Sequence, residues 1–405
     1  MKEILVITGW YLPLLSANGA CLDSILKELY KRGYYSHVVS FAKEHIDYSC
    51  EYCKVYPITD DRKPLSSHFL NWLREGVSQA LYYPKHRNSV VNLALEQCDT
   101  IIKRSNIEAV ICVQMPASAT YMGIQLKRKY PQKRYILYAL DSLTDNIHNF
   151  TSWKKIFKYR NARLEQESFY CMDLVMYLAC HKDYYQREYY KKYGEKLVAV
   201  DVPLIEESIY KKSRALDNQG GGKLVYSGIL IKENRKPDYL IGLIKETKER
   251  GIRLSMHFYS RGDCEKELEA YANNKLKGIL FTHGYVPKDE LDNILANSDI
   301  LVSLGNRMSE TVQMLPSKFL YYMSLGKPIL HIAQDKYDMC IPYLKLYPKA
   351  LVLFENGDFN ANIEAFVSFV SELDGSLVDW KLIKERFKEN TSEYTADIVD
   401  TCIKK

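Results

Sequence analysis

Short apolar runs alternate with amphipathic helical patterns along nearly the whole chain, and this alternation stops once and then restarts. Ile4–Thr8 is an apolar run without period-two alternation, and the residues after it place leucine and isoleucine at helical spacing as far as Gly33. Such runs are typical of parallel strands that are covered on both faces. Further strand candidates are His37–Phe41, Ala109–Val113, Tyr135–Leu140, Leu174–Leu178 and Leu197–Val202. Strands that alternate with helices predict an α/β fold with a doubly wound sheet.

The alternation breaks in a polar stretch that ends in Gly220–Gly222, and it restarts with a strand candidate at Leu224–Tyr226. Later candidates are Leu254–Phe258, Ile300–Leu304 and Ile329–Ile332. A chain of 405 residues is long for one domain, so we predict two. The predicted parts are an N-terminal Rossmann-like domain (1–205), a linker (206–222), a C-terminal Rossmann-like domain (223–385) and a C-terminal helix (386–405). Residues 42–95 give no clear pattern and are predicted to be loops and helices.

Composition excludes several classes of protein. The 56 basic and 50 acidic residues give a net charge of +6, far below the charge density of a dedicated nucleic-acid binder. No run approaches the roughly 20 apolar residues of a membrane-spanning helix. The apolar segment 1–15 contains Gly9, Trp10 and Pro13, which favour a first buried strand over a signal peptide. Cys50 and Cys53 lack the second ligand pair of a zinc site, so we expect free thiols in a reducing cytoplasm.

Ligands of open α/β sheets bind outside the carboxyl ends of the strands, which directs attention to loops 9–19, 141–149, 227–236 and 305–318. The loop before Gly19 leads into a helix whose free N–H groups suit an anion or a sugar, although a plain strand–helix turn explains it equally well. In the third loop, Gly228 allows close backbone approach, and Lys232 and Arg235 supply charge for a diphosphate. A solvated basic loop is the alternative.

The most specific segment runs from Pro316 to Ile329. Pro316 and Ser317 are typical of a helix start, and Gly326 is typical of its end. We therefore predict a short helix of one to three turns between two strands, with Ser317 and Lys318 placed to receive phosphate.

This P-S-K…G-K-P-I segment resembles the donor-site segment of bacterial GT-B glycosyltransferases of the large retaining group, especially those of surface-polysaccharide assembly. Leu301–Asn306, His283–Pro287 and Tyr226–Gly228 are also similar to parts of that family. The resemblance is strong over about 223–332 and looser before 150. It implies two Rossmann-like domains that face a cleft, a last helix that crosses back to the first domain, a nucleotide-sugar bound mainly by the second domain, and neither a required metal nor another cofactor.

The resemblance also implies roles for single residues. Arg235 falls near the family's diphosphate-binding cation, and Ser317 and Lys318 border the donor phosphates. Gly19 matches the loop that abuts the transferring sugar, and Asp141 lies where the family carries a polar residue. We accordingly predict Arg235, Lys318 and Asp141 as catalytic residues. The predicted donor-binding residues are Gly19, Gly228, Lys232, Asn306, Glu310, Ser317 and Tyr321.

Two positions depart from the family pattern. The family places glutamates, which bind the ribose hydroxyls, where this chain has Gln313 and Tyr321, and a phenol cannot replace both hydrogen bonds of a carboxylate. Glu310 is near enough in sequence to compensate. Two alternatives therefore stay open: a non-catalytic GT-B subunit that binds a partner transferase, and a GT-B nucleotide-sugar epimerase.

Basic and aromatic residues mix in 153–163 and again in 184–193. Such surfaces can rest on anionic lipid, and two solvated helices are the alternative. We expect a cytoplasmic, metal-independent enzyme of cell-surface polysaccharide synthesis that acts on a glycan or lipid-linked acceptor, with peripheral contact at the inner membrane face and no nucleic-acid partner.

Overall fold

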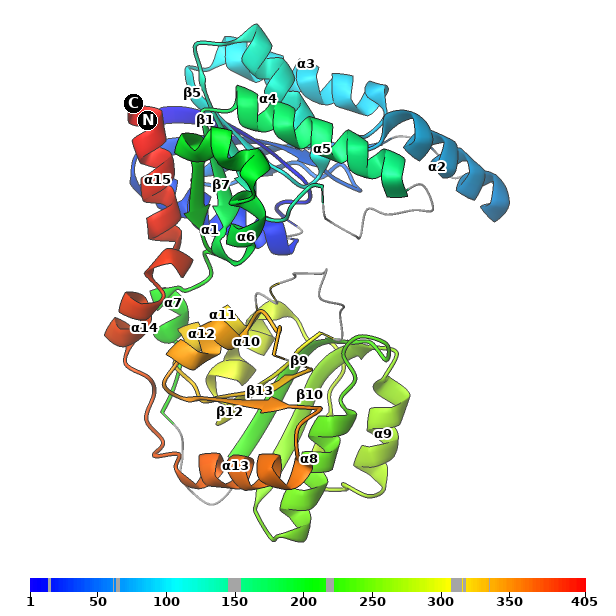
Figure 1. The fold of residues 1–405 in the computed structure, drawn as a ribbon, viewed down its shortest axis with the longest axis vertical. Helices are drawn as coiled ribbons and strands as arrows, with labels where there is room; N and C mark the ends of the chain where they lie inside the picture. Colours follow the sequence, from blue (N-terminus) through cyan, green and yellow to red (C-terminus); the bar gives the residue numbers. More distant parts are fainter. Residues whose placement is uncertain are drawn as a thin grey trace. The chain divides into compact units, whose positions relative to one another are not determined.

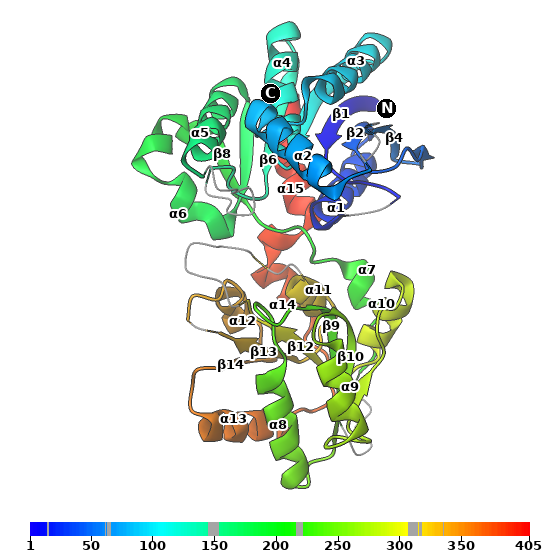
Figure 2. The ribbon, with the colours of Figure 1, turned by 90° about the vertical axis from the view of Figure 1, so that its right-hand side faces the viewer.

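The computed structural model describes residues 1–405 apart from 14–15, 61, 63–65, 145–153, 216–221, 307–314, 316–317 and 335. The chain forms two compact units. The first unit combines Met1–Pro203 with Glu389–Lys405, and the second is Leu204–Lys388. Each unit holds one largely parallel sheet with helices on its faces (Figures 1 and 2). The predicted fold class, with two Rossmann-like α/β domains, is confirmed.

The sheet of the first unit has the order β3-β4-β2-β1-β5-β6-β7-β8. All its pairs are parallel except β3 with β4. The strands are β1 (Lys2–Thr8), β2 (Tyr34–Phe41), β3 (Tyr48–Ser49), β4 (Cys53–Ile58), β5 (Ile107–Val113), β6 (Arg134–Ala139), β7 (Leu174–Leu178) and β8 (Leu197–Val200). The α-helices are α1 (Ala17–Lys31), α2 (His68–Tyr82), α3 (Asn88–Arg104), α4 (Ala117–Lys129), α5 (Lys154–Cys171), α6 (Lys182–Tyr185) and α15 (Ser392–Lys404).

The sheet of the second unit has the order β11-β10-β9-β12-β13-β14, and every pair is parallel. The strands are β9 (Gly222–Leu230), β10 (Leu254–Gly262), β11 (Leu280–Thr282), β12 (Ile300–Leu304), β13 (Ile329–Ala333) and β14 (Ala350–Phe354). The α-helices are α7 (Glu207–Tyr210), α8 (Asp238–Glu249), α9 (Glu265–Asn273), α10 (Lys288–Ala296), α11 (Lys318–Ser324), α12 (Ile341–Leu346), α13 (Phe359–Ser371) and α14 (Trp380–Arg386).

Burial explains why the central strands read as continuous apolar runs. Every residue of Ile4–Ile7 in β1 and of Leu301–Val302 in β12 is fully buried, because helices cover both faces of each sheet. The helix pattern holds in α8, where Leu240, Ile241, Leu243, Ile244 and Thr247 are buried on one side of the helix. Gly33 and Gly326 both have positive φ, at 89° and 68°, as the predicted helix ends require.

The prediction of only loops and helices for residues 42–95 is wrong. This stretch contains β3 and β4, and β4 extends the sheet beyond β2 by pairing along Ser36–Phe41. Cys53–Ile58 alternates buried and exposed side chains only in part and includes Pro57, which weakens a strand pattern. Its pairing near the sheet edge, and not its intrinsic propensity, accounts for the strand.

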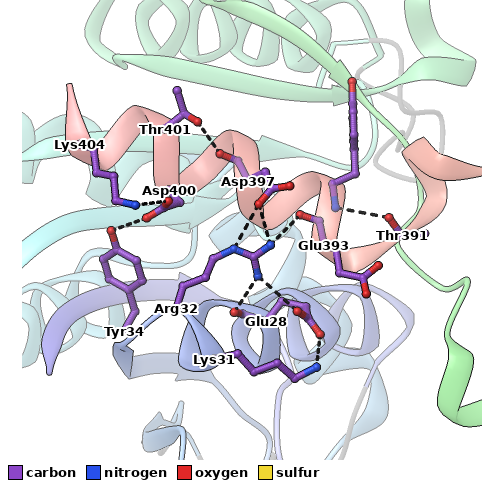
Figure 3. Close-up of polar contacts among 11 residues, drawn as sticks. Glu28, Lys31, Arg32, Tyr34, Thr391, Glu393, Asp397, Asp400, Thr401 and Lys404 are labelled. Carbon is purple, nitrogen blue, oxygen red and sulfur yellow. Dashed lines mark hydrogen bonds and ion pairs between the residues drawn. The ribbon is translucent and has the colours of Figure 1, made fainter.

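The last helix of the chain packs on the first. Figure 3 shows α15 lying along α1, where Arg32 donates to Asp397 and to the Glu393 carbonyl, and Tyr34 donates to Asp400. The predicted return of the C-terminal helix to the first domain is therefore present. Helix α14 belongs to the second unit, where Trp380 contacts Tyr210.

Among the described residues, no helix combines the length and the apolar character needed to cross a lipid bilayer.

Candidate functional site

Gly228 marks a change of backbone direction near the carboxyl end of β9. The predicted loop after Ser227 is wrong in one respect, because the strand continues to Leu230. Gly228 has a φ of 137°, which side-chain-bearing residues rarely adopt. A Cβ atom on Gly228 would lie 3.1 Å from Lys318 Nζ and 3.5 Å from the Tyr226 hydroxyl. The glycine therefore allows the Lys318 side chain to pass directly over the backbone of β9.

Lys318 begins α11 and reaches back to this point. Its Nζ donates to the Ser227 carbonyl at 3.0 Å and lies 4.0 Å from the centre of the Tyr226 ring. Burial lowers the pKa of Lys318 well below its usual value, and the nearby Arg235 guanidinium lowers it further. A carbonyl oxygen and an aromatic face replace only part of the water around an ammonium. An anion that binds next to Lys318 would therefore stabilise its charged form.

Arg235 provides a second cation beside Lys318. It forms a bridge with Ile231 across the loop after β9, and its guanidinium donates to Asn306 Oδ1. Its Nε is buried and has no hydrogen-bond partner in the described part of the chain. Asn306 lies just after β12, which is the strand next to β9 in the sheet. The neighbouring parallel strands β9 and β12 thus bring four residues together at the carboxyl end of the sheet: Arg235, Lys318, Gly228 and Asn306.

The cluster of Arg235 and Lys318 has no balancing carboxylate among the described residues. Over the ranges that the structure describes, no carboxylate forms an ion pair with Lys318, and the interactions that shift its pKa involve Arg235 and Cys340. Two cations in a partly buried position repel each other, and an anion that contacts both would relieve the repulsion. A diphosphate has the charge and the oxygen atoms for this role.

Tyr321 and Tyr322 differ in direction, although they are adjacent on α11. The Tyr322 hydroxyl lies 2.8 Å from Ser227 Oγ and accepts from the Ser227 N–H, so Tyr322 supports the floor of the cation cluster. Tyr321 is placed differently. Burial raises the pKa of its hydroxyl, and the nearby carboxylate of Asp292 on α10 raises this pKa further. The structure therefore places the predicted donor residue Tyr321 beside Asp292, and sequence reasoning missed Tyr322.

The other predicted donor residues of this unit are not part of the cluster. Lys232 pairs with Glu267 on α9 at 2.7 Å, and its N–H donates to Asp263, so its charge is already matched by carboxylates. Glu310 and Ser317 lie outside the described residues, as does Gln313.

A buried polar group supports the turn between β12 and Asn306. Asp338 accepts from the Cys340 N–H at 2.9 Å and lies 3.1 Å from His331 Nε2. A Cβ atom on Gly305 would lie 2.1 Å from Asp338, which only glycine avoids. His331, Asp338 and Cys340 also place three potential metal-ligand atoms within 4.8 Å of one another among the described residues. Because Asp338 already has hydrogen-bond partners, we interpret the group as a support for Gly305.

Gly19 and Asp141 both belong to the first unit. Gly19 lies in the first turn of α1, and its N–H is bound by the Ser16 side chain at 3.0 Å, so the loop predicted up to Gly19 ends earlier than expected. Asp141 follows β6. Burial raises the pKa of the Cys180 thiol, and the charges of Asp201 and Asp141 add to that shift. Gly19 and Asp141 are thus part of a different unit from Arg235 and Lys318.

The first unit contains a pocket that sequence reasoning missed. It has a volume of about 390 Å³ and opens at the carboxyl ends of β1, β2, β4 and β5. Its lining includes Trp10, Phe41, Lys43, Asp60, His86 and Pro116. Trp10 was part of the loop singled out after the first strand, but His86 and Asp60 fall in the stretch that gave no pattern.

The pocket combines an aromatic face with polar groups. Lys43 Nζ lies 4.5 Å from the centre of the Trp10 ring, and His86 stacks on Phe41. Ser118 Oγ accepts from the His86 N–H at 2.7 Å and lies 2.8 Å from His86 Nδ1, so the ring is held by a hydrogen bond at Nδ1. Burial lowers the pKa of His86, so the ring is neutral near neutral pH.

Asp60 at the pocket rim stays ionised. Burial acts to raise its pKa, but hydrogen bonds from Arg62 and Arg87 outweigh this and lower the pKa to about 2. The pocket therefore offers an indole face, a carboxylate, an ammonium and a neutral imidazole. This combination suits a polar molecule with both hydroxyl groups and apolar C–H faces, such as a sugar.

The chain matches no protein-family model. A search of curated proteins also finds no match. Solved structures do match over nearly the full length. Sucrose-phosphate synthase from Thermosynechococcus elongatus is 10% identical with a TM-score of 0.66, and the match covers 100% of this chain and 98% of that one.

Two further structures extend this comparison. A protein from Listeria monocytogenes assigned as a UDP-N-acetylglucosamine 2-epimerase is 11% identical, with a TM-score of 0.56 and coverage of 100% and 96%. WaaG, a glycosyltransferase involved in lipopolysaccharide biosynthesis, is 13% identical, with a TM-score of 0.54 and coverage of 97% and 95%. The chain has the GT-B fold. At these identities the likeness shows the GT-B fold alone, so its chemistry has to be argued from the residues.

Proposed function

We propose that this chain is a glycosyltransferase that moves a sugar from a nucleotide-sugar donor to a glycan or lipid-linked acceptor. The observation that carries the proposal is the pair of basic side chains, Arg235 and Lys318, beside the positive-φ Gly228 at the carboxyl end of the second sheet. No carboxylate of the described residues forms an ion pair with Lys318. Several neighbours of the same fold are glycosyltransferases by name, which supports the reaction class.

The proposed chemistry needs charge stabilisation at the leaving group. When the bond between sugar and diphosphate breaks, negative charge grows on the diphosphate oxygens, and positioned cations lower the energy of that state. Lys318 and Arg235 supply this charge themselves, which supports a metal-independent transfer. A retaining reaction, in which the leaving phosphate helps to remove the acceptor proton, rests on the family resemblance. Ser317 stays a predicted phosphate contact.

We assign the acceptor to the pocket of the first unit. The Trp10 face suits the C–H side of a sugar ring, and the Asp60 carboxylate and the His86 imidazole are hydrogen-bonding groups for its hydroxyls. Asp141 remains a proposed residue for acceptor orientation, and Gly19 a proposed neighbour of the transferring sugar. The biological setting proposed from the resemblance is cell-surface polysaccharide synthesis in the cytoplasm.

Tyr321 bears on the alternative of a non-catalytic subunit. The phenol lies toward Asp292 and cannot supply the carboxylate that the family uses for the ribose. Donor binding then depends on the diphosphate cations and on residues outside the described ranges, such as Glu310. An epimerase of the same fold would also bind the nucleotide, so binding and turnover have to be measured separately.

The decisive experiment titrates UDP-, GDP-, ADP- and dTDP-linked sugars by calorimetry into the wild-type chain and two alanine variants. We expect one nucleotide class to bind, and Lys318→Ala and Arg235→Ala each to weaken it by about 10- to 100-fold, as loss of a charge-assisted contact to phosphate implies. Lys232→Ala is the matched control, because its ammonium is paired with Glu267 and should leave binding unchanged.

Turnover separates the transferase from the epimerase, and a chain that binds the nucleotide without either reaction is the non-catalytic subunit. Release of free nucleotide with transfer of the sugar to an added acceptor supports the transferase. Conversion of the sugar without nucleotide release identifies an epimerase. Absence of binding by all four nucleotide classes at millimolar concentration rejects the donor site itself.

A further inference from the structure

Helix α2 has an apolar side that nothing in the described structure covers. None of the residues of His68–Tyr82 is buried. Trp72 and Leu81 are each 65% exposed and Phe69 is 62% exposed, and Leu70, Leu73 and Val77 are also exposed. In Figure 1, α2 projects from the side of the first unit. Six large exposed apolar residues on one 15-residue helix form a patch of the kind that marks an interaction surface.

The orientation of α2 is the reverse of an ordinary surface helix. Phe69, Leu73 and Val77 repeat at helical spacing and face outward. The residues of the helix middle that are partly covered are polar: Asn71, Arg74 and Ser78. A globular surface helix turns its apolar stripe to the protein, so this arrangement indicates that the apolar side of α2 is used elsewhere.

The helix is nevertheless held in place at its end. Arg160 on α5 donates to the Ala80 carbonyl, the Tyr83 ring lies 4.4 Å from the Phe157 ring, and Asn161 donates to the Tyr83 hydroxyl. An isolated helix of this length is marginal in water. The attachment at one end keeps the outward-facing side in a defined direction relative to α5.

The charge next to the apolar side is positive. Over residues 68–85 and 157–163 the chain carries Arg74, Lys85, Lys158, Arg160 and Arg163 against one acidic residue, Glu75. Tyr159 is 70% exposed beside these cations. Exposed aromatic and apolar side chains flanked by lysine and arginine match the interface of an anionic bilayer. A second copy of the chain fits less well, because a two-fold contact would bring the same basic residues together.

We propose that α2 is an interfacial helix that inserts its apolar side into a bilayer of anionic phospholipids, while Lys158, Arg160 and Arg163 contact the headgroups. The contact lies at α2 and the start of the described part of α5, and not at the tyrosine-rich stretch 184–193. The lipid contact does not depend on the proposed transferase activity.

The position of α2 in the chain links this surface to the pocket. Asp60 precedes the helix and His86 follows it, and both line the pocket. Arg62 joins the two regions by pairing with Asp60 at 2.8 Å and with Glu75 on α2 at 3.3 Å. A helix anchored in lipid would therefore hold the pocket near the membrane surface. This last consequence, that the acceptor is lipid-linked, rests on the proposed function of the pocket.

The test is flotation of the full chain with vesicles of phosphatidylglycerol and phosphatidylethanolamine, compared with vesicles of phosphatidylcholine. We expect binding to the anionic vesicles, weakened by added salt. Leu73→Glu should weaken it by at least about tenfold, because a charge enters the apolar side. Ser78→Glu adds the same charge on the opposite side of α2 and should bind like wild type. Circular dichroism and the melting temperature of both variants report whether the fold is kept.

Brominated lipids give an independent readout of depth. Quenching of indole fluorescence should fall in Trp72→Phe while vesicle binding persists. The proposal is overturned if wild type binds neither type of vesicle, if it binds both equally, or if the two glutamate variants behave alike. It is also overturned if wild type is a dimer that Leu73→Glu converts to a monomer, since a second copy then covers α2.

Discussion

Arg32 Nη2 lies 2.7 Å from Asp397 Oδ1, which joins two residues 365 positions apart in the chain. The same guanidinium donates to the Glu393 carbonyl and to the backbone and side chain of Glu28 (Figure 3). The Arg32 side chain, directly after α1, thus donates to acceptors on two helices and holds α15 against the first unit.

Removing this side chain should loosen α15. We expect Arg32→Ala to lower the free energy of unfolding of the first unit by about 1 kcal/mol, because the hydrogen bonds are only partly shielded from water. Denaturant unfolding followed by circular dichroism measures the change. Arg250→Ala is the control, since that arginine also pairs with two carboxylates but is exposed, and it should have little effect. Equal losses in both variants would contradict the role of Arg32.

Gly228→Ala should damage the donor site more than the fold. The new Cβ would require a strained φ and would crowd Lys318 Nζ at 3.1 Å, so we expect a loss of stability of about 1–3 kcal/mol and at least about tenfold weaker nucleotide binding. Gly194→Ala is the matched control, because a Cβ there meets nothing within 4 Å. Calorimetry on both variants decides, and unchanged binding in Gly228→Ala would exclude this edge of the sheet as the site.

Nucleotide binding should take up a proton at Lys318. Burial lowers the pKa of the empty-site ammonium, and a bound diphosphate raises it again by favouring the charged form. At a pH between the pKa of Lys318 in the free protein and its higher pKa in the complex, nucleotide binding adds a proton to Lys318. The affinity for the nucleotide therefore falls as the pH rises through that interval.

Calorimetry over a pH series above about 7, in buffers of different ionisation enthalpy, locates this uptake, because the nucleotide phosphates are already ionised there. Lys318→Met should abolish the proton uptake as well as weaken binding. An uptake that persists in Lys318→Met would assign the proton to another group.

Glu165 should be essential to the first unit. It is 1% exposed, and its carboxylate accepts from the Leu143 N–H and from the hydroxyls of Thr144, Tyr184 and Tyr190. Glu165→Gln replaces an acceptor oxygen by a donor, so we expect a loss of about 2–4 kcal/mol, measured by denaturant unfolding. Glu167→Gln, on the more exposed side of α5, is the control. Stability equal to wild type in Glu165→Gln would show that the hydroxyls find other acceptors.

Trp10→Ala should separate the acceptor from the donor. The indole forms one wall of the pocket in the first unit, so we expect the KM for the acceptor to rise by about tenfold, as loss of an aromatic contact implies. The Kd of the nucleotide should stay unchanged. Steady-state kinetics and calorimetry on the same preparation provide both values, and a parallel loss of nucleotide affinity would argue against a separate acceptor pocket.

The sequence was sufficient for the architecture because the central strands are buried on both faces. Ile4–Thr8 and Ile300–Leu304 are continuous apolar runs for that physical reason. It was insufficient for β4, where partial alternation and Pro57 hide a strand that depends on its neighbour β2. It also ended β9 too early, because Gly228 suggests a loop although the strand continues past it.

The sequence predicts the location of those candidate-site residues that directly follow a strand, because the carboxyl ends of neighbouring parallel strands lie together. Arg235 and Asn306 follow adjacent strands and meet for that reason. Side-chain direction on α11 is not predictable from the sequence pattern, which indicates Tyr321 although Tyr322 contacts Ser227. The charge of Lys232 predicts a phosphate contact, but the carboxylate that pairs with it is on a helix 35 residues later, at Glu267. Such long-range pairings are not encoded in local spacing.

The contact between α1 and α15 forms late during synthesis, because α15 is the last helix to leave the ribosome. The second unit is encoded entirely between two parts of the first, so a nascent chain completes the inserted unit while the earlier one still lacks its final helix. Until Arg32 meets Asp397, the α1 surface that receives α15 stays uncovered, and a chaperone or a wrong partner has access to it during that interval.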